Sequence, residues 1–112
     1  SSDFFGKKDT AEEIFFFIKE NCTTNITARD IAKKFNISIS LLEKKLKARY
    51  DMSPVRLKNY LRIEASKQLL AEGYNIDEVS SRTGFCDRYH FTKTFVSFVK
   101  CSPARFIANS RI

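Results

Sequence analysis

Residues 75–106 of this chain have the sequence NIDEVSSRTGFCDRYHFTKTFVSFVKCSPARF, and residues 27–57, TARDIAKKFNISISLLEKKLKARYDMSPVRL, keep the same order of caps, apolar positions and a Ser-Pro pair. The offset is 48 residues at the start of the repeat and 49 after one inserted residue. Solenoid proteins also repeat at such periods, but they normally need three or more copies to bury a continuous core. Two copies therefore indicate a pair of similar small units.

Each copy predicts a helix, a tight turn and a second helix. In the first copy, Thr27 followed by Asp30 is close to the capping box that starts a helix, and Asn36 favours the turn that ends one. Ser53-Pro54 then predicts the start of a long helix that ends near residues 72–73. Its expected buried face consists of the apolar residues that recur every four positions, which are Leu57, Leu61, Ala65 and Leu69.

The expected fold is all-helical, because the chain has no run of alternating β-branched residues and only three glycines. We expect about seven helices, arranged as two helix-turn-helix subdomains joined by a long central helix. The expected parts are a polar N-terminal segment (1–10), a first subdomain (11–53), a connecting helix (54–73) and a second subdomain (74–112).

The charge of the chain is unevenly distributed. The net charge is +7, and residues 33–67, with ten basic and three acidic side chains, supply the whole excess. A basic domain favours a nucleic-acid partner, although many basic surfaces are merely solvated. No apolar run approaches the roughly 20 residues of a membrane span, so no membrane partner is expected.

Cysteine and histidine are too few and too scattered to indicate a disulfide framework or a zinc site. The chain has three cysteines and one histidine, so we expect free thiols in a reducing cytoplasm, with no metal and no cofactor. An enzyme has little support, because no nucleophile motif and no pair of catalytic carboxylates is present.

The second helix of a helix-turn-helix unit enters the DNA major groove, so its exposed face decides the function. In residues 38–49, Leu42 and Leu46 are the expected anchors, and in residues 87–99 the anchors are Phe91 and Phe95. The expected exposed stripes are Ser40, Glu43, Lys44 and Lys47 in the first copy, and Arg88 or Tyr89, Thr92, Lys93 and Val96 in the second. A solvated amphipathic helix is the alternative for either copy, and in the first copy Glu43 could pair with Lys47 at i+4.

The length of the connecting helix adds a geometric expectation. A helix of about 18 residues is roughly 27 Å long at about 1.5 Å per residue. That length is comparable with the roughly 34 Å between successive major grooves on one side of a duplex. We therefore expect one chain to insert two helices into successive major grooves of an asymmetric site.

These residues resemble the AraC/XylS family of bacterial transcription regulators, whose DNA-binding domain has two helix-turn-helix units joined by a long helix. The resemblance covers about residues 11–107. In the second copy it rests on Ile76, Val79, Gly84-Phe85, Phe91, Phe95 and Pro103. In the first copy and the connecting helix it rests on Ser38, Leu42, Ser53-Pro54, Arg62, Ala65 and Leu69-Leu70.

The resemblance implies a cytoplasmic, sequence-specific DNA-binding domain of a bacterial regulator, usually an activator that contacts RNA polymerase. It also implies an effector-binding or dimerisation domain preceding this one, in agreement with a first residue that is not Met. The implied base contacts are Ser40, Glu43, Lys44, Arg88, Tyr89, Thr92 and Lys93. The implied phosphate contacts are Lys47, Arg62 and Arg105.

Four positions depart from the family pattern, namely Ser80, Val96, Phe106 and Ile107. Val96 and Ile107 stand where the family commonly has cations, so the second unit loses phosphate-binding charge. We therefore expect the first unit to supply most of the affinity and the second more of the conditional specificity.

A hypothesis from another class remains open at this point. In it, Phe16, Phe17 and the basic connecting helix form a surface for an acidic protein partner, and the chain is a helical protein-interaction module. Such a module would bind duplex DNA without sequence preference. Salt-dependent, sequence-specific DNA binding distinguishes the two hypotheses.

Overall fold

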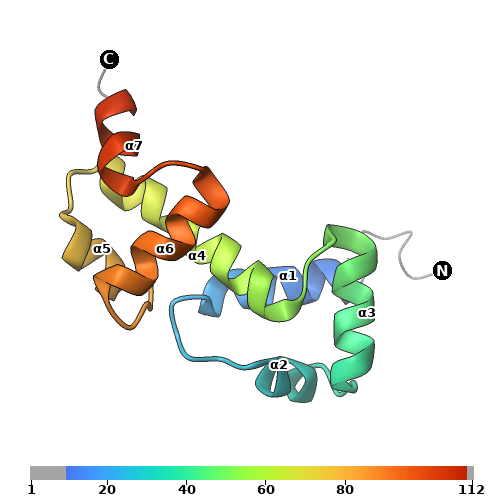
Figure 1. Cartoon of the computed structure of the whole chain (residues 1–112). Coiled ribbons are helices and arrows are strands. Elements are labelled where there is room, and N and C mark those ends of the chain that lie inside the picture. The colour runs from blue at the N-terminus through green and yellow to red at the C-terminus, as the bar shows by residue number, and fades with distance from the viewer. Residues whose placement is uncertain (1–9, 111–112) are drawn as a thin grey trace. The chain divides into compact units, whose positions relative to one another are not determined.

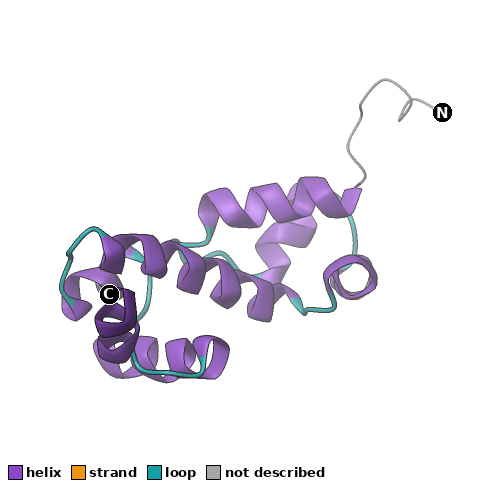
Figure 2. Cartoon of the chain, turned by 90° about the horizontal axis from the view of Figure 1, so that it is seen from above, coloured by secondary structure: helices purple, strands orange, loops and turns teal. Residues whose placement is uncertain are grey.

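The computed structural model describes residues 10–110, and these form seven α-helices connected by short loops (Figures 1 and 2). The all-helical fold is therefore confirmed. Most of the expected N-terminal segment 1–10 lies outside the described residues. The helices are α1 (Thr10–Asn21), α2 (Ala28–Lys34), α3 (Ile39–Tyr50), α4 (Pro54–Ala71), α5 (Ile76–Arg82), α6 (Arg88–Val99) and α7 (Pro103–Ser110).

The internal repeat of the sequence is also a repeat of structure. Helices α2 and α5 both have seven residues and start 48 positions apart, whereas α3 and α6 both have 12 residues and start 49 positions apart. The tight turns between the paired helices contain Asn36 (φ 55°) and Gly84 (φ 90°), and both residues have left-handed backbone conformations. Asparagine and glycine adopt that conformation most readily, which explains their places in the sequence.

The first helix of each pair starts at a cap that the sequence predicts. The Thr27 hydroxyl accepts from the Asp30 amide at 3.2 Å, and the Asp30 carboxylate accepts from the Thr27 amide at 2.9 Å, which completes a capping box. In the second pair, the Asn75 side-chain oxygen accepts from the Glu78 amide at 2.8 Å. These contacts satisfy amides that have no partner within the helix.

The described residues fall into two compact units, one made of residues up to 21 and 26–58, the other of residues 22–25 and those from 59 onward. In the first unit, buried side chains come from all of its helices and include Ile14, Ile18, Ile31, Ala32, Leu42, Leu46 and Leu57. The core of the second unit is a single cluster of Ile63, Leu70, Val79, Phe85, Phe91 and Phe95. Each unit thus holds its own helix-turn-helix pair on its own apolar core.

The buried face of α4 differs from the sequence-based expectation. Leu57 and Leu61 are buried as expected, but Ala65 and Leu69 are only half-buried. The other buried residues of the later turns are Arg62, Ile63, Ser66 and Leu70. A spacing of four residues advances about 40° beyond a full turn of an α-helix, so such a stripe leaves any straight buried face after a few turns.

None of the helices between residues 10 and 110 is both long enough and apolar enough to span a bilayer.

Candidate nucleic-acid interface

The second helix of each pair turns one face into its unit and leaves the opposite face open. Leu42 and Leu46 of α3 are fully buried, and so are Phe91 and Phe95 of α6. Residues three and four positions apart share a helix face, so these anchors fix which residues point outward. The two outward faces belong to different units.

The outward face of α3, which we call the first stripe, consists of Ser40, Glu43, Lys44 and Lys47, and all four side chains are exposed. The Lys47 ammonium lies 3.3 Å from the Asp51 carboxylate at the end of the helix, and both side chains are largely solvated. An exposed pair of this kind contributes at most about 1 kcal/mol, so it is easily exchanged for another anion. The pairing of Lys47 with Asp51 differs from the Glu43 pairing considered from sequence.

The outward face of α6, which we call the second stripe, consists of Tyr89, Thr92, Lys93 and Val96. Tyr89 is 73% exposed, Lys93 is exposed and Thr92 is half-buried. Arg88 lies to one side of the stripe, where its Nε is 3.6 Å from a carboxylate oxygen of Asp77 in α5. The second stripe therefore combines one cation with aromatic, hydroxyl and aliphatic groups.

Helices α3 and α6 begin and end at equivalent positions of the sequence repeat. The Ser38 hydroxyl accepts from the Leu41 amide at 3.0 Å, and the Asp87 carboxylate accepts from the His90 amide at 2.7 Å. Both helices also end at a residue with a left-handed backbone, Asp51 or Lys100. Residue n of α3 therefore corresponds to residue n + 49 of α6 along the whole helix.

A phosphate contact requires an exposed side chain, but Arg62 is buried. Its side chain is 5% exposed, its Nε donates to the Cys22 carbonyl, and its Nη2 donates to the Thr24 carbonyl at 2.8 Å. The guanidinium carbon lies 5.3 Å from the centre of the Phe85 ring. Because the donors are aimed at the 22–25 turn, we assign Arg62 to the interior of the second unit and not to the phosphate backbone.

Burial also explains the electrostatics of Arg62. Loss of water lowers the pKa of its guanidinium, and the nearby thiols of Cys22 and Cys86 partly oppose that effect. An arginine remains charged despite such a change, because its ordinary pKa lies far above physiological pH. The charge is therefore kept and used for hydrogen bonds to backbone carbonyls. The sequence pattern could not show this, since the acceptors lie about 40 positions away in the chain.

Two lysines of α4 also make contacts within the protein. Lys58 Nζ donates to the Ile26 carbonyl at 2.8 Å, and Lys67 Nζ lies 2.8 Å from the Glu64 carboxylate. Arg105 in α7 is exposed, as a phosphate contact requires. The basic excess of residues 33–67 is therefore not all available on one binding surface.

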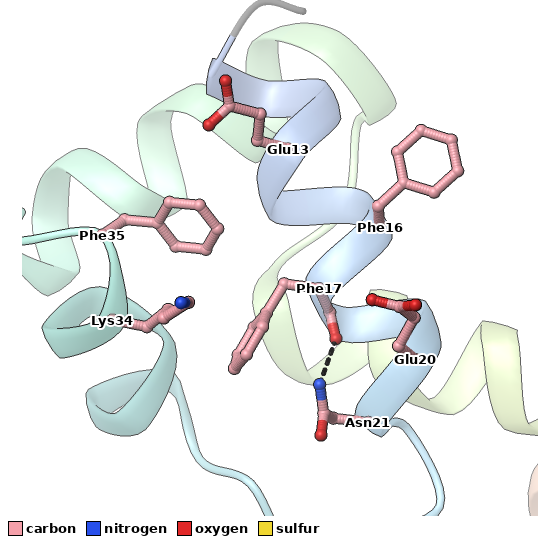
Figure 3. A pocket seen from close by; sticks show the side chains of 7 residues that line it. All are labelled: Glu13, Phe16, Phe17, Glu20, Asn21, Lys34 and Phe35. Atoms are coloured by element: carbon pink, nitrogen blue, oxygen red, sulfur yellow. Dashed lines mark hydrogen bonds between the residues drawn. The ribbon is translucent and has the colours of Figure 1, made fainter.

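A groove in the first unit bears on the alternative hypothesis of an acidic protein partner (Figure 3). Figure 3 shows Phe17 and Phe35 between α1 and α2, with their ring centres 5.7 Å apart, whereas Phe16 points away and is 42% exposed. The remaining lining residues include Glu13 and Glu20 as well as Lys34. Two carboxylates disfavour an acidic partner at this groove.

Within residues 10–110, no cluster of three or more histidine, cysteine or acidic side chains could hold a metal ion. In the same part of the chain, the three cysteines form no disulfide; Cys22 is buried, Cys86 is exposed and Cys101 is half-buried.

The family model described as a helix-turn-helix domain matches residues 31–109. Over 91 residues, the chain is 32% identical to the lactose operon transcription activator of Staphylococcus xylosus, and this alignment covers 80% of the chain and 33% of that protein. The chain spans about a third of the length of the curated relatives that it matches.

Solved structures share the fold of this chain. A transcriptional regulator with an AraC-type DNA-binding domain from Chromobacterium violaceum matches with a TM-score of 0.83 at 23% identity, covering 88% of this chain and 89% of that chain. The DNA-binding domain of the global transcriptional factor AdpA, solved in complex with a target DNA, matches with a TM-score of 0.80 at 22% identity, covering 93% and 95% of the two chains.

Proposed function

The chain belongs to the helix-turn-helix family of AraC/XylS-type transcription regulators, and we propose that it binds double-stranded DNA sequence-specifically through α3 and α6. The observation that carries the proposal is the matched pair of outward stripes, each held at the same register by caps and buried anchors. A helix of this kind presents its exposed side chains to base edges in the major groove. The proposed function is DNA binding, and it involves no catalytic residue.

Within the first stripe, Ser40, Glu43 and Lys44 contact bases and Lys47 contacts a phosphate. Lysine can donate to the guanine acceptors, a carboxylate can accept from the cytosine amino group, and serine is less discriminating. Lys47 lies near the end of the helix, and its present partner Asp51 is highly solvated. Exchange of that carboxylate for a phosphate therefore costs little.

Within the second unit, Arg88, Tyr89, Thr92 and Lys93 contact bases, and Arg105 contacts a phosphate. Arg88 must leave Asp77 to reach guanine, and their separation of 3.6 Å with both side chains well exposed makes this exchange easy. Lys93 lies at the centre of the second stripe, at the position that corresponds to Lys44. The second stripe thus keeps one central cation for base recognition.

On DNA, α3 and α6 enter successive major grooves of one asymmetric site, since a single chain carries both units. The relatives are about three times as long as the matched segment. The domain accordingly acts within a longer regulator in the bacterial cytoplasm, beside an effector-binding or dimerisation domain. Transcription activation through contact with RNA polymerase is the proposed outcome, supported by the description of the Staphylococcus xylosus relative as an activator.

A selection from random double-stranded oligonucleotides at physiological salt tests this function. We expect enrichment of one asymmetric sequence about two helical turns long, bound at least roughly a thousandfold more tightly than a scrambled duplex. The affinity should fall steeply with salt, because binding releases counterions from the phosphates. A Glu13→Gln, Glu20→Gln variant, altered only at the groove of Figure 3, serves as the matched control and should bind with unchanged specificity.

Equal affinity for selected and scrambled duplexes would refute the proposed function. It would instead favour the protein-interaction alternative, in which the basic surface attracts any polyanion.

A further inference from the structure

Val96 is an aliphatic side chain on the outward face of a helix whose other outward groups are largely polar. It is 41% exposed and lies one turn beyond Thr92 and Lys93, on the side of α6 opposite Phe91 and Phe95. Isolated exposed aliphatic residues are common on protein surfaces and need no explanation by themselves. Val96 differs from such residues because it lies within the second stripe, the face that α6 presents to DNA in the proposed function.

The first unit supplies a direct comparison for Val96. Lys47 is the residue at the same register of α3, and its ammonium extends to a carboxylate at the helix end. Valine has no donor for a phosphate and no acceptor for a base. Its two γ-methyl groups can make only apolar contacts, and the major groove offers one apolar group on the base edges, the C5-methyl of thymine.

We propose that Val96, with the γ-methyl of Thr92, recognises thymine by contact with its C5-methyl group. The inference rests on the proposed function, because it requires α6 to lie in the major groove. Thr92 and Val96 are four positions apart and therefore adjacent on one helix face. Lys93 lies beside them and can donate to a neighbouring guanine, so the half-site bound by α6 contains a thymine next to the base pair that Lys93 contacts.

This assignment gives the two units different modes of recognition. The first stripe carries Ser40, Glu43, Lys44 and Lys47, which recognise DNA by charge and hydrogen bonds. At equivalent positions, the second stripe has Tyr89, Thr92, Lys93 and Val96. Of these, Val96 and the γ-methyl of Thr92 add apolar contacts. Apolar contacts depend little on salt, whereas phosphate contacts weaken as salt rises. The thymine contact should therefore persist at high salt.

Replacement of single thymines by deoxyuridine in the selected duplex tests the proposal, because it removes only the C5-methyl group. We expect one thymine, or two adjacent thymines, in the half-site bound by α6 whose replacement weakens binding roughly fourfold. In Val96→Ala, this thymine-to-uracil ratio should fall well below the wild-type value, because only the γ-methyl of Thr92 then contacts the thymine. Val96→Ile keeps the branched γ-carbons and should retain the ratio.

Two controls separate recognition from folding and from general affinity. Val96→Ala should fold normally, because the side chain is exposed and alanine favours helix; circular dichroism and thermal unfolding verify this. Lys47→Ala, at the equivalent position of α3, should weaken binding to thymine and uracil duplexes equally and leave their ratio unchanged.

The inference alone is overturned if the wild-type chain binds its selected site specifically yet no deoxyuridine replacement weakens binding. It is also overturned if Val96→Ala keeps the wild-type ratio at the same thymine. A selection that enriches no sequence refutes the proposed function, and the inference with it.

Discussion

The carbonyl oxygen of Thr23 lies only 2.5 Å from where a Cβ on residue 84 would be, so Gly84 and Thr23 are in backbone contact within the second unit. Gly84 also has φ +90°, a conformation that side-chain-bearing residues rarely adopt. The resemblance to the family includes this glycine, and the structure supplies two physical reasons for it.

Gly84→Ala should lower the free energy of unfolding by about 2 kcal/mol or more, since it combines backbone strain with a collision against backbone. Gly73→Ala is the matched control, because Gly73 has a similar φ of +98° but nothing within 4 Å of its Cβ position. Urea denaturation of both variants measures the difference. Equal losses at the two sites would contradict the role of the Thr23 contact.

Arg62→Ala should reduce stability by about 3 kcal/mol, because it removes the buried charged donor of the Cys22 and Thr24 carbonyls. The salt dependence of DNA binding by the folded fraction should stay the same. Arg105→Ala should do the opposite, with stability changed by less than about 0.5 kcal/mol and the salt slope reduced by roughly one. A reduced salt slope in a fully stable Arg62→Ala variant would contradict the interior role and support the phosphate contact expected from sequence.

The charge asymmetry of the chain predicts unequal contributions to affinity. Replacement of Lys44 and Lys47 by alanine should weaken DNA binding more than replacement of Arg88 and Lys93, because the first unit carries more of the excess positive charge. Gel-shift titrations at two salt concentrations provide the ranking. The reverse ranking would place the main electrostatic contribution in the second unit.

Asp30 predicts a pH dependence of stability. Hydrogen bonds from Thr27 lower the pKa of its carboxyl below the ordinary value of 3.8. Because the folded pKa is depressed, the stabilisation is fully present above the ordinary pKa and is lost as the pH falls through the lower folded value. Denaturation of wild type and Asp30→Asn from pH 6 down to pH 2 should show their difference shrinking at the acid end. A difference that stays constant over this range would contradict the role of the ionised carboxylate.

The sequence predicted those features whose causes are local. Thr27 with Asp30 predicted the start of α2, and Ser53-Pro54 predicted the start of α4, because a cap and its amide are three residues apart. The buried anchors Phe91 and Phe95 followed from helical spacing. Each of these features depends on neighbours within one or two helical turns.

Features that depend on distant parts of the chain were not predictable in the same way. The family resemblance implied a phosphate contact for Arg62, but its acceptors are carbonyls of a turn about 40 positions earlier. The buried face of α4 passes through Ile63, Ser66 and Leu70 because it packs within the second unit, which local periodicity could not indicate. The individual DNA contacts of the two stripes remain predictions.

Hydroxyl-radical footprinting of the selected duplex tests the central claim most directly, namely that α3 and α6 are two separate DNA-recognition helices of one chain. We predict two protected regions about one helical turn apart. At saturating protein, Lys44→Ala with Lys47→Ala should weaken one region, and Arg88→Ala with Lys93→Ala should weaken the other. A single protected region, or loss of the same region in both variants, would contradict the account.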